Sequence, residues 1–308
     1  MKIESHSSKK IVLLDGGMGQ ELMKRSKAKP HPLWSAKVLL DEPELVENVH
    51  IDFIEAGASI ITVNTYSATK ERLNRDGAEG MFNKLHDKAI EVAHRARDQC
   101  KRSDVKIAGC LPPLYGSYKP ESAPSLDECI ERYQIISRKQ APYIDLFICE
   151  TMSSIKEAQA SITAAASENR ETWCALTISD QSNCMLRSNE PLEQAIDQLI
   201  KLGHSANLIN CSTPEAITLA LNCLKMDQRP FGAYANGFDS IDALSIGGTV
   251  DVLTSRKNLG PRAYLQHALA WVTSGATIIG GCCEISPDHI KVIYDTLNKL
   301  DYKITNSL

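Results

Sequence analysis

The feature that most constrains the fold of this chain is the regular alternation of two kinds of segment along its 308 residues. Short apolar runs are typical of buried parallel strands, and longer amphipathic stretches are typical of helices. The expected strands span residues 11–15, 59–64, 105–111, 144–149, 173–178, 207–210, 230–234 and 277–279. The expected helices span residues 44–56, 79–100, 126–141, 155–166, 191–202, 214–224, 261–273 and 287–299.

Eight strands, each followed by a helix, predict an α/β fold, a single (β/α)8 TIM barrel. The length agrees, because such a barrel takes about 250 residues plus insertions. No linker, repeat or low-complexity segment divides the chain, so we expect one domain over residues 1–308. An open doubly wound sheet is the alternative fold. A dinucleotide-binding sheet is disfavoured, because Gly16, Gly17 and Gly19 lack the Gly-x-Gly-x-x-Gly spacing.

Charge and hydropathy exclude two classes of partner. The net charge is -4 and no stripe of lysine and arginine is present, which argues against nucleic-acid binding. No apolar run approaches the length of a membrane span, and the N-terminal residues lack the apolar core of a signal peptide. We therefore expect a cytoplasmic protein that acts on small molecules. A homo-oligomer is left open.

Polar and sulfur-containing residues follow several of the expected strands. Chemistry in a barrel of this kind takes place at the carboxyl ends of the strands. Asp15, Asn64, Glu150, Cys211 and the pair at 282–283 all occupy such positions. The loops at 114–125 and 256–262 are long, and either is a candidate border of the same site.

Three of the ten cysteines stand out from the rest, most of which we expect to be buried packing residues. Cys282 and Cys283 are adjacent and follow two glycines, and neighbouring cysteines rarely form a disulfide with each other. In a barrel, Cys211 reaches the same point. Three thiolates suit zinc and leave a fourth position open, which indicates catalysis. The alternative is that these cysteines only pack at crowded loop starts.

Two carboxylates at strand ends are candidates for substrate binding. Asp15 and Glu150 are expected to point into the mouth of the barrel, where an unpaired carboxylate is unfavourable. A substrate ammonium is one partner, and a helix terminus or a surface arginine is the other. Asn64 either contacts a substrate carboxylate or caps its own loop.

Six motifs, in order, resemble the homocysteine S-methyltransferase family over nearly the whole chain. They are LDGGMG at 14–19, HPLWSAK at 31–37, NTY at 64–66, CET at 149–151, INC at 209–211 and GGCC at 280–283. The segment LWSAKVLL at 33–40 is most similar to the group that uses S-methylmethionine or S-adenosylmethionine. LPPLYGSY at 111–118 and YANGF at 234–238 depart from that group's pattern, and both loops are expected to face the methyl donor.

The resemblance implies a zinc-dependent methyltransferase that makes methionine from homocysteine and a sulfonium donor. It implies that Cys211, Cys282 and Cys283 hold Zn²⁺. It also implies that Asp15 and Glu150 bind the amino group of homocysteine. Zinc would deprotonate the homocysteine thiol, because a thiol bound to a metal loses its proton.

Other substrate contacts come from the chain's own aromatic residues. The net negative charge of a zinc ion with three thiolates favours a cationic donor. We expect Trp34 and Tyr66 to pack around that cation through their ring faces, or else simply to pack in their loops.

Three other functions are weighed against this one. The same fold and zinc site could serve betaine, another onium donor or another thiol acceptor. A hydrolase with Cys282 or Cys283 as nucleophile lacks a histidine at a neighbouring strand end. A non-enzymatic barrel that stores metal or senses oxidants would have no use for Asp15 and Glu150.

Overall fold

The computed structural model describes residues 9–27, 35–181, 184–248 and 250–307. Its strands are β1 (Lys10–Leu13), β2 (Ile60–Thr62), β3 (Lys106–Leu111), β4 (Leu146–Met152), β5 (Glu171–Leu176), β6 (Ala206–Asn210), β7 (Phe231–Tyr234), β8 (Ile278–Ile279) and β9 (Lys303–Thr305). Each of the eight strands expected from the sequence overlaps one of β1 to β8. The ninth was not expected.

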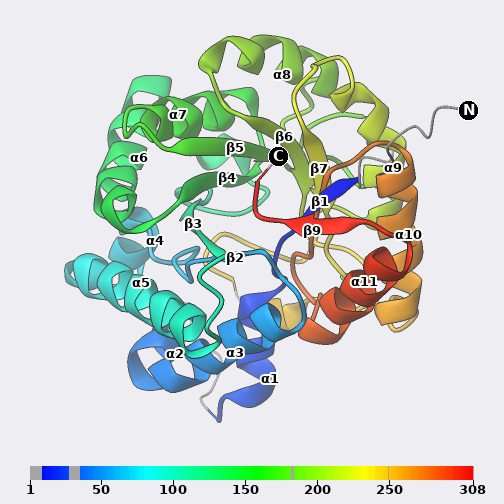
Figure 1. Ribbon diagram of the computed structural model, residues 1–308. Coiled ribbons are helices and arrows are strands. Elements are labelled where there is room, and N and C mark those ends of the chain that lie inside the picture. Colours follow the sequence, from blue (N-terminus) through cyan, green and yellow to red (C-terminus); the bar gives the residue numbers. More distant parts are fainter. Residues whose placement is uncertain (1–8, 28–34, 182–183, 249, 308) are drawn as a thin grey trace, which may run out of the picture.

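The α-helices surround the strands (Figure 1). They are α1 (Met18–Arg25), α2 (Ser35–Asp41), α3 (Pro43–Glu55), α4 (Lys70–Arg75), α5 (Phe82–Gln99), α6 (Leu126–Gln140), α7 (Ile155–Ala166), α8 (Leu192–Leu199), α9 (Pro214–Leu224), α10 (Pro261–Thr273) and α11 (Pro287–Lys299). The eight expected helices match α3 and α5 to α11. Helices α1, α2 and α4 are short and were not predicted, because each is only about two turns or less and offers too few residues to establish a helical period.

All strands lie in one parallel sheet with the order β2-β3-β4-β5-β6-β7-β8-β1-β9. The sheet curls so that the end of β1 approaches β2, although these two strands are not neighbours in the sheet order. Leu14 forms an isolated parallel bridge with Ile60, and the Asp15 N–H donates to the Ile60 carbonyl at 3.1 Å. Strand β9 pairs with the start of β1, where Lys10 lies opposite Lys303. The α/β class predicted from the sequence is confirmed.

The two faces of the strands enter different apolar clusters. Val12 and Leu14 belong to a cluster made almost entirely of strand residues, whereas Ile11 and Leu13 belong to the cluster that contains the helices' apolar faces. This alternation is that of a parallel sheet buried on both faces. The strands' inner positions are therefore filled with side chains.

No helix among the described residues is long and apolar enough to cross a lipid bilayer.

Four predicted strand ends differ from the structure, those of β1, β2, β4 and β5. Asp15 and Asn64 were expected to be the last residues of strands, but β1 ends at Leu13 and β2 at Thr62. The pairing between the end of β1 and β2 stops at these residues because a side chain takes the place of a backbone acceptor. The Thr62 N–H donates to Asp15 Oδ2 at 2.7 Å. Conversely, β4 continues to Met152, so Glu150 lies within the strand.

Candidate functional site

The residues that the sequence singled out lie around one cavity of about 170 Å³ at the carboxyl ends of the strands. Those that contribute to its wall are Asp15, Asn64, Tyr66, Glu150, Cys211, Cys282 and Cys283. Trp34 lies outside the described residues. The chain thus brings together side chains from five separate strand ends, as the positional argument from the sequence requires.

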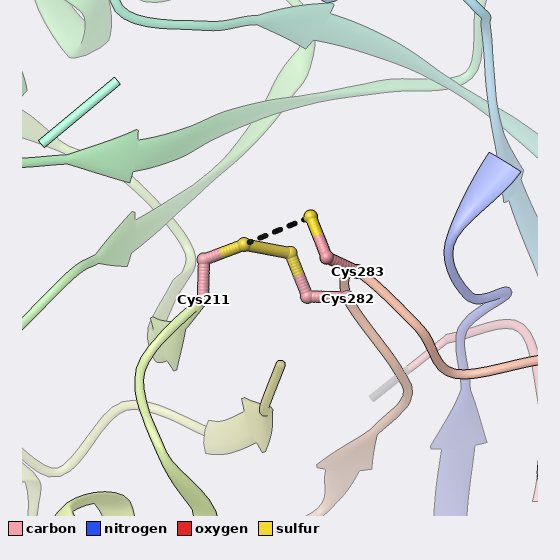
Figure 2. Close-up of side chains that lie close together, drawn as sticks. All are labelled: Cys211, Cys282 and Cys283. Atoms are coloured by element: carbon pink, nitrogen blue, oxygen red, sulfur yellow. Dashed lines mark hydrogen bonds between the residues drawn. A yellow bond between two sulfur atoms is a disulfide. The ribbon is translucent and has the colours of Figure 1, made fainter. Parts of the chain in front are cut away.

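Three cysteine sulfur atoms meet in this cavity (Figure 2). Those of Cys211, Cys282 and Cys283 all lie within 4.8 Å of one another. Cys211 comes directly after β6, and the other two follow β8 by three and four residues. Sulfur atoms from two loops at this separation are a donor set that suits a thiophilic ion such as zinc.

Backbone hydrogen bonds fix the loops that carry the cysteines. The Cys211 N–H donates to the Tyr234 carbonyl at 3.1 Å, and the Cys282 N–H donates to the Ala235 carbonyl at 2.9 Å. The Cys283 carbonyl accepts from the Gly237 N–H at 2.9 Å. All three cysteines are therefore tied to β7 or to the loop that follows it.

Several residues at the site have left-handed backbone conformations. Cys211 has φ of 47°, Thr151 beside Glu150 has φ of 61°, and Glu284 after Cys283 has φ of 67°. Non-glycine residues rarely adopt this region. The backbone bends sharply at these positions, and at Thr151 the bend coincides with a shift of register within β4.

One sequence expectation about the cysteines is corrected. We expected three thiolates, but Cys211 and Cys282 form a disulfide, and the Cys283 sulfur lies 3.9 Å from that of Cys211. Their Cα atoms are 5.6 Å apart, which lies in the usual range for a disulfide. The two sulfurs come from different strand ends, so the restriction on adjacent cysteines does not apply to them. A metal could be bound only after reduction, because its ligands are thiolates.

The remaining thiol is held in its neutral form. Burial, with a smaller contribution from Glu284, raises the pKa of Cys283 to about 12. A thiol in this environment ionises at neutral pH only if a cation is placed beside it. The site therefore fits a metal ion better than it fits a free cysteine nucleophile.

Two buried carboxyl groups lie in the same cavity. Asp15 is 7% exposed, and burial together with the nearby Glu150 raises its pKa to about 7, although hydrogen bonds from Thr62 oppose the rise. Burial also raises the pKa of Glu150 to about 7. The Cys110 thiol donates to Glu150 Oε1 at 2.9 Å. Neither carboxyl group has a cationic partner among the described side chains, so both are suited to a ligand cation.

Asn64 and Tyr66 make contacts that support their loops. Asn64 Nδ2 donates to the Ser35 carbonyl at 3.3 Å, at the start of α2. The Tyr66 hydroxyl lies 2.8 Å from Ser117 Oγ, and the Arg72 guanidinium lies 5.1 Å from the Tyr66 ring centroid. This bond ties Asn64 to α2 rather than to its own loop, so both predicted roles of Asn64 stay predictions. One face of the Tyr66 ring is taken by a cation of the protein itself.

Sequence reasoning missed several residues of the cavity wall. Arg72 carried no motif, Tyr234 was noted only as the first residue of the loop at 234–238, and Cys110, which bonds to Glu150, was counted among the packing cysteines. The expected border at 114–125 is confirmed by Tyr115 to Tyr118. The border at 256–262 is wrong, because the wall is built from residues 238–253 of the same connection. Arg256 points instead to Glu215 on α9, at 2.7 Å.

A protein-family model described as "Homocysteine S-methyltransferase" matches residues 12–297. The homocysteine S-methyltransferase of Escherichia coli is 29% identical over 92% of this chain and 94% of its own length. A selenocysteine methyltransferase of Astragalus bisulcatus is 28% identical over 95% of this chain and 94% of its own length.

Solved structures agree with these relatives. The metallated form of the E. coli homocysteine methyltransferase MmuM has a TM-score of 0.78 and 27% identity, over 93% of this chain and 96% of that one. Its oxidized form has a TM-score of 0.74 and 26% identity over the same shares.

Proposed function

Because this chain belongs to the homocysteine S-methyltransferase family, we propose that it holds zinc with Cys211, Cys282 and Cys283 and methylates homocysteine from a sulfonium donor. The observation that carries the proposal is the gathering of three sulfur atoms beside two buried carboxyl groups in one cavity. A store for metal ions alone would have no use for the carboxyl groups. A methyltransferase with an amino-acid acceptor uses both.

The sulfur atoms fit the metal by their chemistry. Three thiolates leave one tetrahedral position for a substrate thiol, and the metallated E. coli structure supports a metal in this family. Zinc bound there would lower the pKa of the substrate thiol and so supply a nucleophile at neutral pH. Binding and orientation of the substrates depend on the protein's own side chains.

The carboxyl groups of Asp15 and Glu150 bind the homocysteine ammonium in this proposal. Their separation from bulk water strengthens the ion pair, and Cys110 and Thr62 hold the two side chains in place. Asn64, Tyr66 and Trp34 complete the substrate contacts. The reaction breaks the methyl–sulfur bond of the donor and forms one to homocysteine. The donor leaves as a neutral thioether and the thiol proton is released.

Three further sequence predictions are carried into the proposal. The bridge between Leu14 and Ile60 supports closure of the sheet into a (β/α)8 barrel. The absence of a linker supports one domain over residues 1–308. A reducing compartment such as the cytoplasm would keep the cysteines as thiols. A homo-oligomer stays a prediction.

The direct test is methionine formation by reduced, zinc-loaded protein. S-methylmethionine, S-adenosylmethionine, betaine and dimethylsulfoniopropionate are supplied separately with homocysteine, and selenocysteine replaces homocysteine in a parallel series. We expect turnover with homocysteine and with S-methylmethionine or S-adenosylmethionine. Turnover with betaine alone would replace the sulfonium proposal, and no turnover with any donor despite bound zinc would refute the activity.

Zinc binding should depend on reduction of the Cys211–Cys282 disulfide. Protein prepared without reductant should bind little zinc, and treatment with a phosphine should release two more reactive thiols and restore zinc binding. Thiol titration and zinc analysis on the same samples measure both quantities. Full zinc binding by protein whose disulfide is intact would contradict the proposed ligands.

The buried carboxyl pair should make the ligand-free protein less stable as pH rises. The pKa of Glu150 is about 7 in the folded protein, against 4.5 for an unperturbed glutamate, so the folded state binds more protons between these values. Stability is therefore lost as pH rises through this window. Urea unfolding at pH 5 and pH 8 should show this decrease, and Glu150→Gln should reduce it by on the order of 2 kcal/mol. An equal decrease in both proteins would contradict this.

A further inference from the structure

Arg72 is a cation in the wall of the cavity that the proposed function leaves unused. It lies on the short helix α4, which follows β2, and Thr69 caps that helix by accepting from the Arg72 N–H at 3.2 Å. Its Nε and Nη2 donate to the Pro113 carbonyl at 3.2 Å and 2.9 Å. The guanidinium is thereby fixed between Tyr66 and the loop after β3.

In the part of the chain that the structure describes, no carboxylate oxygen lies within ion-pair distance of Arg72. Its neighbours differ in this respect: Arg75 pairs with Asp76 at 2.9 Å, and Arg132 pairs with Glu71 at 2.7 Å. Burial lowers the pKa of Arg72, but a guanidinium stays protonated at neutral pH. A largely desolvated cation without a counter-charge is unfavourable unless a ligand supplies one.

The hydrogen-bonding capacity of Arg72 is also incomplete. Nη1 donates to none of the described residues, and the contact of Nη2 with Ser117 Oγ is long, at 3.5 Å. A carboxylate accepts two parallel N–H bonds from a guanidinium, and arginine suits this geometry better than lysine does. The edge formed by the two Nη atoms is available for such a group.

The charge pattern of the cavity narrows the ligand further. A purely cationic methyl donor would gain nothing from Arg72 and would be repelled by it. A substrate that carries both a cation and a carboxylate would satisfy Arg72 at one end and the carboxyl groups or sulfurs at the other. We propose that Arg72 binds the carboxylate of a zwitterionic substrate in the methyl-transfer site, an inference that rests on the proposed function.

Two substrates carry this group, namely homocysteine and an amino-acid sulfonium such as S-methylmethionine. Calorimetry with reduced, zinc-loaded protein distinguishes them, with each acid and its methyl ester as the four ligands. Arg72→Gln should weaken binding of one acid by about 10- to 100-fold. In the wild type, the ester of that acid should bind correspondingly weakly, whereas in Arg72→Gln the acid and the ester should bind alike.

Two variants separate recognition from folding. Arg72→Lys retains the charge and should recover part of the affinity, but not the full bidentate binding. Arg102→Gln is the matched control, because Arg102 pairs with Asp104 before β3, at the opposite ends of the strands, and should bind all four ligands as the wild type does. Thermal unfolding of each variant reports any loss of the Pro113 contact.

The inference is overturned if Arg72→Gln binds both acids within about twofold of the wild type, or if it still distinguishes acid from ester. Its outcome is independent of turnover. If methionine forms normally and binding does not depend on Arg72, the proposed function stands and only the carboxylate-binding inference fails. Arg72-dependent binding without methyl transfer from any donor would refute the function while the carboxylate site stands.

Discussion

Replacing Cys283 by serine should lower methionine formation by about a thousandfold or more, because a required ligand is lost rather than weakened. A serine hydroxyl is not ionised at neutral pH and is a poor ligand for zinc, which takes thiolates, imidazoles and carboxylates. Cys283 is the best of the three to substitute, since the disulfide between the other two can still form. Zinc content and initial rates on reduced protein are the measurements.

The control for this variant is Cys100→Ser. Cys100 is half-buried at the end of α5, outside the cavity wall, so zinc binding and turnover should stay at wild-type values. Retention of both zinc and activity by Cys283→Ser would remove this cysteine from the proposed ligands. Loss of activity with zinc retained would assign Cys283 a different role, in contact with a substrate.

Replacing Glu150 by glutamine should raise the KM for homocysteine by about 100-fold while zinc remains bound. The carboxylate is expected to pair with the substrate ammonium in a buried site, and an amide of the same shape keeps the packing but not the charge. The Cys110 thiol, 2.9 Å away, can still donate to the amide oxygen, so the fold should be retained. The measurements are initial rates over a range of homocysteine concentrations, together with zinc analysis.

Glu131→Gln serves as the comparison, because Glu131 is exposed on α6, away from the cavity. Its KM for homocysteine should equal that of the wild type. An unchanged KM in Glu150→Gln would count against the ammonium-binding role. An equal rise in the KM of the donor would show that the variant disturbs the whole cavity.

The strand ends were predictable because the signal is local and repeated. Each apolar run is short, bounded and followed by a helical pattern, and the carboxyl ends of parallel strands lie on one side of a sheet. That rule placed Asp15, Glu150 and Cys211 at one site although they are far apart in the sequence. It did not depend on the exact strand bounds, which differ by up to three residues at the carboxyl ends.

The features that the sequence did not reveal depend on contacts between residues that only the folded chain brings together. Arg72 stands in the sequence KERLNR, where nothing distinguishes it from Arg75, and only the fold gives Arg75 a carboxylate partner while leaving Arg72 without one among the described residues. The bond from Cys110 to Glu150 joins neighbouring strands, whose register is not written in either segment. The disulfide joins loops 71 residues apart.

The left-handed backbone conformation of Cys211 lowers the stability of the fold at a position whose side chain the proposed activity needs. A non-glycine residue in that conformation costs about 1 kcal/mol or more, which glycine would avoid. In the reduced protein, exchange of this cysteine for glycine would relieve that strain but remove a proposed metal ligand. In the oxidised protein the same exchange would also break the disulfide with Cys282, whose loss outweighs the gain. Stabilising libraries of this enzyme should accordingly hold position 211 fixed.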